Sequence, residues 1–204
     1  MSLIERWSEV AGNSRAAQAV GAELVARWAE AHRRYHTTDH LRAVLDAITP
    51  LAELAADPTA VRLAAWFHDA VYDGHPGRDE ERSAQLAQAT LRRCGLGRAL
   101  AAETARLVRL TATHDPAPGD ANGAVLCDAD LAILAAPEPG YLAYVRAVRA
   151  EYAHLPDQVF SSGRAMVLRG LLALPSLYRT RPAHDLWESA ARANMSAELT
   201  RLDR

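Results

Sequence analysis

The pair His68-Asp69 lies at the end of an apolar run that covers residues 61–67. That run predicts a helix buried in the core. A carboxylate without partners is costly in such surroundings, so Asp69 needs a cation or a full set of hydrogen-bond donors. Taken alone, the pair is explained as well by a core histidine that is hydrogen-bonded to an aspartate at a capped helix end.

Two further residues of metal-binding type lie on other predicted helices, His40 upstream of the pair and Asp130 downstream. Two imidazoles and two carboxylates form a mixed nitrogen and oxygen donor set. Such a set suits Mn²⁺, Fe²⁺, Co²⁺, Ni²⁺ or Zn²⁺, and Mg²⁺ is a further option. We therefore expect His40, His68, Asp69 and Asp130 to bind one divalent cation, with Asp128 as the alternative to Asp130.

His36 precedes His40 by four residues. If both are helical, they share one face of the helix about one turn apart. If the helix begins at Thr38, His36 lies at its mouth and His40 points inward. In either case His36 is a candidate for a role beside the metal.

His114 and Arg34 are candidates of a different kind. His114 ends a predicted helix, where the helix dipole alone would favour a histidine. Arg34 has the planar guanidinium that suits bidentate binding of phosphate, although an arginine at a helix end is commonly just solvated. We expect both to lie near the cation.

Apolar residues recur along the chain with a period of about 3.6, and no run alternates as a strand would. The sequence thus predicts an all-α fold. Two loops rich in Gly, Pro and Asp, at 73–77 and 115–120, each follow a histidine-bearing helix, which suits the rim of a site. The expected helices cover 14–32, 38–56 with a break or bend at Pro50, 57–72, 79–94, 98–113, 125–135, 139–153, 157–173 and 184–202.

The 204 residues are 50% apolar, enough to bury a core as one domain over 1–204. The net charge of −2 with mixed signs argues against a dedicated nucleic-acid binder. Cys94 and Cys127 form no CxxC pair and indicate free thiols in a reducing compartment. The charged N-terminal segment does not resemble a signal peptide, and no apolar stretch is long enough to span a membrane. We expect a cytoplasmic protein.

The order of these residues resembles the HD-domain superfamily of metal-dependent phosphohydrolases. More specifically, the chain is similar to predicted HD phosphohydrolases whose substrate is unassigned. The matching stretches cover most of the chain: Arg34-Tyr35-His36, residues 65–72, Glu80-Glu81-x-Ser83-Ala84, residues 126–134, Tyr144-x-x-x-Arg149-x-Glu151-Tyr152 and Glu188-x-x-Ala191-Arg192-x-Asn194.

The resemblance implies a helical bundle that holds one divalent metal through a first His, the His-Asp pair and a late Asp. The context Ala129-Asp130-Leu131 is similar to that of the late ligand, which favours Asp130 over Asp128. Tyr35-His36-x-x-x-His40 also resembles the motif of cyclic-nucleotide phosphodiesterases, in which the first His donates a proton to the leaving oxygen and the second binds metal. His114 resembles the extra His that some members use for a second metal or for phosphate.

The implied reaction is attack on phosphorus by a water that the metal activates. Asp69 or Asp128 would orient that water, His36 or His114 would protonate or hydrogen-bond a phosphoryl oxygen, and Arg34 would help to neutralise charge. The expected substrate is a small phosphoester, with a nucleotide as the first class, and a homodimer is left open.

Two other functions remain open at this stage. An HD-fold oxygenase with a diiron centre would need about six His and Asp ligands, more than this set comfortably supplies. A non-catalytic module that binds a metal or a nucleotide would bind without turnover.

Overall fold

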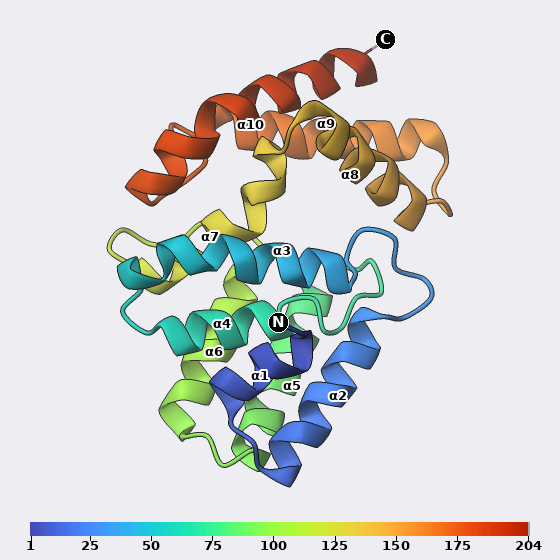
Figure 1. Cartoon of the computed structure of the whole chain (residues 1–204). Helices are drawn as coiled ribbons and strands as arrows, with labels where there is room; N and C mark the ends of the chain where they lie inside the picture. The colour runs from blue at the N-terminus through green and yellow to red at the C-terminus, as the bar shows by residue number, and fades with distance from the viewer. Residues whose placement is uncertain (204) are drawn as a thin grey trace.

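Every regular element in the computed structural model, which describes residues 1–203, is a helix (Figure 1). The fold is therefore all-α, as the periodicity predicts. The α-helices are α1 (Leu3–Ala11), α2 (Arg15–Trp28), α3 (Thr38–Ile48), α4 (Pro58–Phe67), α5 (Arg78–Arg93), α6 (Arg98–Leu110), α7 (Ala121–Asp130), α8 (Glu138–Glu151), α9 (Asp157–Ala173) and α10 (Arg181–Leu202), and two short 3₁₀ helices, η1 (Thr49–Leu54) and η2 (Leu131–Ala135), extend α3 and α7.

Two capping residues fix where the site-bearing helices begin. The Thr37 side chain accepts a hydrogen bond from the Asp39 amide and starts α3. Asp57 accepts from the amides of Thr59 and Ala60, and Pro58 follows at the first helical position of α4. His36 thus precedes α3, while His40 lies in its first turn, which is the second of the two placements considered above.

The observed helices differ from the expected ones in their number and in several bounds, for example α2, which ends at Trp28, and α7, which begins at Ala121. Residues 3–11 form a helix, α1, that was not predicted. It forms because Leu3, Trp7 and Ala11 recur every four residues and are buried against the core. The helix expected over 57–72 ends at Phe67, and His68 is its C-terminal cap. Pro50 lies in the 3₁₀ segment that follows α3, at the expected break.

Helix α4 lies at the centre of the packing. It contacts α1, α3, α5, α6 and α7, and its residues 63–67 have no solvent exposure. The Trp28 indole NH donates to the Trp66 carbonyl at 3.0 Å and ties α2 to α4. A helix surrounded in this way carries apolar residues on all sides, so its C-terminal end delivers His68 into the interior.

Helices α8, α9 and α10 gather at the end of the molecule away from α1 and α2 (Figure 1). A buried ion pair joins them, because the Arg164 guanidinium donates to both carboxylate oxygens of Glu198 at 2.8 and 3.0 Å. Arg164 also donates to the Tyr144 hydroxyl at 3.0 Å, and the Tyr141 hydroxyl donates to Glu198. Breaking such a pair would leave a buried charge without its partner.

None of the helices within 1–203 has the length and apolar character needed to cross a membrane.

A glycine at the contact between α1 and α2 gives a test of this packing. A Cβ at Gly21 would overlap Cδ1 of the buried Trp7 ring. We expect Gly21→Ala to lower the free energy of unfolding by roughly 1–3 kcal/mol through overpacking. Gly170 in α9 has open space around the same position, so Gly170→Ala should be neutral or stabilising by up to ~1 kcal/mol. Urea unfolding measures both; equal effects of the two changes would contradict the packing described.

Candidate metal centre

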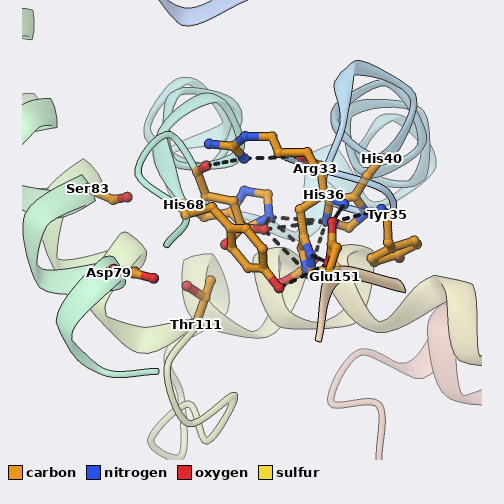
Figure 2. Close-up of polar contacts among 12 residues, drawn as sticks. Arg33, Tyr35, His36, His40, His68, Asp79, Ser83, Thr111 and Glu151 are labelled. Carbon is orange, nitrogen blue, oxygen red and sulfur yellow. Dashed lines mark hydrogen bonds and ion pairs between the residues drawn. The ribbon is translucent and has the colours of Figure 1, made fainter. Parts of the chain in front are cut away.

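Three side chains from separate helices meet at one point. His40 comes from α3, His68 from the end of α4, and Asp130 is the last residue of α7. Their ligand atoms all lie within 4.8 Å of one another. His40 Nε2 is 3.3 Å from His68 Nε2 and 3.1 Å from Asp130 Oδ1, and His68 Nε2 is 3.5 Å from the same oxygen. Figure 2 shows the two imidazoles directed toward a common point between α3 and α4.

Asp69 lies beside this group. Its Oδ2 is 3.1 Å from His68 Nε2 and 3.9 Å from His40 Nε2. The residue follows the helix cap in a turn, which lets two adjacent side chains approach the same point from different directions. The structure therefore brings His40, His68, Asp69 and Asp130 together.

The protonation of His68 indicates what these atoms can bind. His68 Nδ1 is 2.8 Å from the Ala65 carbonyl, which can only accept a hydrogen bond, so Nδ1 carries the proton. The lone pair of Nε2 then faces His40 Nε2 and the carboxylate oxygens. Acceptors that converge in this way, with the other nitrogen of His68 held by the backbone, fit a divalent cation.

Burial and charge act in opposite directions on these groups. The two histidines are only 7% and 2% exposed, and burial lowers the pKa of His40. Burial also opposes the charged form of His68, but Asp69 and Asp130 raise the pKa of His68 well above its usual value. Desolvation of Asp130 is outweighed in turn by the surrounding histidines, which lower its pKa. The carboxylates thus demand a positive charge at this point, from a proton or from a metal ion.

Arg33 holds the backbone of the His-Asp pair in place. Its guanidinium is fully buried and donates from Nη1 to the carbonyls of Asp69 and His36, at 2.8 and 3.1 Å. The same group lies 5.4 Å from the centre of the Trp28 ring and 5.5 Å from that of Tyr72, which favours a cation. Sequence reasoning selected the neighbouring Arg34 instead, because nothing in the pattern shows which of two adjacent arginines turns inward.

Glu151, at the end of α8, organises the segment before α3. Its Oε1 accepts the amides of Arg34, Tyr35 and His36 at 2.8, 2.8 and 2.9 Å, and its Oε2 accepts from the Tyr72 hydroxyl at 3.1 Å (Figure 2). Oε2 also lies 2.7 Å from His36 Nδ1. Burial would favour the protonated carboxyl, but the contacts with His36 and these amides lower the pKa of Glu151 to about 2. The sequence contained Glu151 in a matching stretch without indicating this role.

Because Glu151 accepts the Nδ1 proton of His36, the other ring nitrogen faces the cluster. His36 Nε2 is 3.9 Å from Asp69 Oδ2, and the ring stacks on Tyr72 with centroids 4.1 Å apart. His36 is therefore fixed in tautomer and in orientation.

His114 reaches Asp130 from another side. Its Nε2 is 2.8 Å from Asp130 Oδ2, the oxygen that His40 and His68 leave free. The backbone of His114 is left-handed, with φ of 51°, a conformation uncommon for residues other than glycine. This turn at the end of α6 directs the imidazole back toward the cluster.

Arg34 and Asp128 are not brought to the cluster. Arg34 is exposed, and its guanidinium donates to the carbonyls of Ala31 and Arg33. Asp128 is buried and accepts the amides of Arg179 and Thr180, both at 2.7 Å. Residues two apart on a helix lie about 200° apart around its axis, so Asp128 and Asp130 face different neighbours. Asp128 thereby holds the turn that leads into α10.

A cavity of about 310 Å³ opens onto the cluster. All four predicted ligands, His40, His68, Asp69 and Asp130, line it, as do His36 and His114. Asp79 and Glu80 of α5 and four tyrosines also line it. A small molecule can therefore reach the point where the ligand atoms converge.

Metal binding gives the first test of the site. We expect the protein to bind a divalent cation such as Mn²⁺, and we expect His68→Ala to weaken that binding by more than about 100-fold, because it removes a ligand. His184 is exposed and contacts Asp185, so His184→Ala serves as the matched control. Calorimetric titration of metal-stripped protein measures both. Unchanged affinity in His68→Ala would contradict the assignment.

The Glu151 carboxylate gives a pH-dependent test. Its pKa falls from 4.5 to about 2 on folding, so it stabilises the fold above about pH 4.5, and this contribution is lost as the pH falls toward 2. At pH 7 we expect Glu151→Gln to destabilise the protein by roughly 3 kcal/mol or less. The difference should shrink as the pH falls from about 4.5 to about 3.5, which lies within the window between the two pKa values, as measured by urea unfolding. A difference that is independent of pH would contradict this role.

No protein-family model, no curated protein and no solved structure matches this chain. The chemistry of the site follows from its own donor atoms and from their surroundings.

Proposed function

We propose that this chain is a metal-dependent phosphohydrolase of the HD type, acting on a small phosphoester. The observation that carries the proposal is the meeting of His40, His68, Asp69 and Asp130 at the base of one cavity. These four occur in the chain in the order that the HD motif has, and His36 lies beside them as the motif's additional histidine would.

The donor set supplies the binding site for the cation. Two imidazole nitrogens and two carboxylates leave further coordination positions on a cation of this kind. A divalent cation bound there supplies Lewis acidity, which makes water a nucleophile near neutral pH and stabilises negative charge on a phosphoryl oxygen.

His36 is placed to move a proton. Glu151 holds Nδ1, and Nε2 faces the cavity, so a protonated His36 can donate from Nε2 to the oxygen that leaves phosphorus. His114 lines the same cavity and is placed to hydrogen-bond another phosphoryl oxygen.

Two features argue for hydrolysis over the other functions considered. A diiron oxygenase would need about six His and Asp ligands, whereas four such residues, His40, His68, Asp69 and Asp130, converge here. The two further histidines are already engaged, His114 by Asp130 and His36 by Glu151. A purely structural metal site would be closed, whereas this one opens to a cavity. A nucleotide is the first substrate class to test, by analogy with the resemblance.

A single comparison tests the reaction. Metal-stripped protein should not release phosphate from a panel of nucleotides and simple phosphoesters, and addition of Mn²⁺ should restore release from at least one of them. His36→Asn should lower kcat by roughly 10²–10⁴-fold, because it removes the proton donor. Asn retains an amide that can donate to Glu151, so the bound metal should be unchanged.

The outcomes separate the alternatives. Metal bound at full occupancy without turnover of any phosphoester would contradict the proposal and favour a binding module. Iron with consumption of O₂ would favour the oxygenase. Equal kcat for wild type and His36→Asn would remove His36 from the chemistry.

A further inference from the structure

A second cavity, of about 400 Å³, adjoins the one above the metal ligands. The two share wall residues, among them His36, Tyr72 and Tyr152. His36, the predicted proton donor, therefore lies at the boundary between them. A molecule whose reacting group sits at the cluster can extend directly into the second cavity.

The walls of the second cavity are mainly aromatic and aliphatic. Four of the chain's six tyrosines line it, together with Phe160. The rings of Tyr152 and Phe160 lie with centroids 6.0 Å apart. Arg149 fixes this corner, because it donates to the Tyr152 carbonyl at 2.7 Å and lies 4.8 Å from the centre of the Phe160 ring. The flat walls are thus held in place before anything binds.

The outer edge of this cavity is apolar and exposed. Val159 and Val167, on α9, are 55% and 53% exposed and line it. Large apolar side chains exposed beside an open cavity are typical of a ligand-binding surface. Covering them would gain free energy from the removal of apolar surface from water.

The charges around the second cavity disfavour an anionic occupant. Arg164 is the one arginine in the wall, within the described residues, and both of its donor groups toward Glu198 are engaged. The neighbouring cavity carries the carboxylates of Asp69, Asp79, Glu80 and Asp130. An anionic group in the second cavity would therefore find no free cation and would be repelled by its surroundings.

We infer that the second cavity is the subsite for the organic part of the substrate, and that this part is uncharged, flat and apolar. The inference rests on the proposed function, since the metal cavity must hold the phosphoryl group for the two to be occupied together. The substrate class is then a phosphoester of an aromatic group. A phosphoester whose organic part is a short polar or highly charged chain leaves the subsite unfilled.

Two esters with matched leaving groups test this. Benzyl phosphate and methyl phosphate both release a simple primary alcohol, so their intrinsic reactivities are similar, and only benzyl phosphate carries a ring. With Mn²⁺-loaded protein we expect kcat/KM to be roughly 10- to 100-fold higher for benzyl phosphate. Equal values for the two esters, with both hydrolysed, would overturn the subsite and leave the hydrolase intact.

Variants on α9 locate the effect. Val159 lines the subsite but not the metal cavity, whereas Met166 is 73% exposed and lines neither. Val159→Asp should reduce kcat/KM for benzyl phosphate by about tenfold or more, mainly through KM, and leave methyl phosphate unchanged. Met166→Asp, the matched control, should change neither. A loss that is equal for both esters, or equal in both variants, would overturn the assignment.

Binding without turnover separates the two proposals. Benzylphosphonate and methylphosphonate cannot be hydrolysed, and calorimetry on Mn²⁺-loaded protein compares their affinities. Tighter binding of benzylphosphonate that Val159→Asp abolishes would support the subsite even if no ester is hydrolysed, and in that event the proposed function would fail alone. Equal affinity of the two phosphonates would overturn the subsite.

Discussion

The structure depends on the meeting of electron-pair donors, imidazole nitrogens and carboxylate oxygens, at a buried point. His68 Nδ1 donates its hydrogen bond to the Ala65 carbonyl, so in the neutral ring the lone pair of Nε2 faces His40 and the carboxylates of Asp69 and Asp130. A buried cluster of lone pairs and carboxylates is stable only around a positive charge. A divalent cation meets this need and stays within reach of the cavity above it, and the surrounding fold can be understood as the frame that keeps these atoms close together.

Two buried hydrogen-bonding groups maintain that frame. Arg33 binds the carbonyls of His36 and Asp69, and so joins the segment before α3 to the turn after α4. Glu151 binds three consecutive amides of the same segment from α8. The helices themselves are held by apolar packing around α4, which tolerates small shifts, whereas these directional contacts fix where the ligands point. Ligand geometry thus depends on residues that do not touch the cation.

The sequence predicted the helices and the convergence of the ligands better than it predicted their supports. Apolar spacing identified most helices, but α1 is a short helix whose three buried residues gave too brief a pattern. From the sequence, Asp130 was chosen over Asp128 as the metal ligand only through the resemblance. The structure gives the physical reason: the two residues lie on different sides of the helix, so Asp130 alone of the two faces the cluster. Arg33 and Glu151 were not assigned roles. Arg33 binds the Asp69 carbonyl, 36 residues away, and Glu151 binds the Arg34 amide, 117 residues away. A local sequence pattern carries no signal of such contacts. The subsite, too, arises only when α8 and α9 fold beside the metal cavity.

The central claim is that one cation binds where these side chains meet. A crystal of the protein grown with Mn²⁺, measured at a wavelength where manganese scatters anomalously, tests it directly. We predict an anomalous peak at coordination distance, about 2.0–2.3 Å, from His40 Nε2, His68 Nε2 and a carboxylate oxygen each of Asp69 and Asp130. A map with no peak at this point in Mn²⁺-saturated crystals, or with the four side chains bound only to one another, would contradict it.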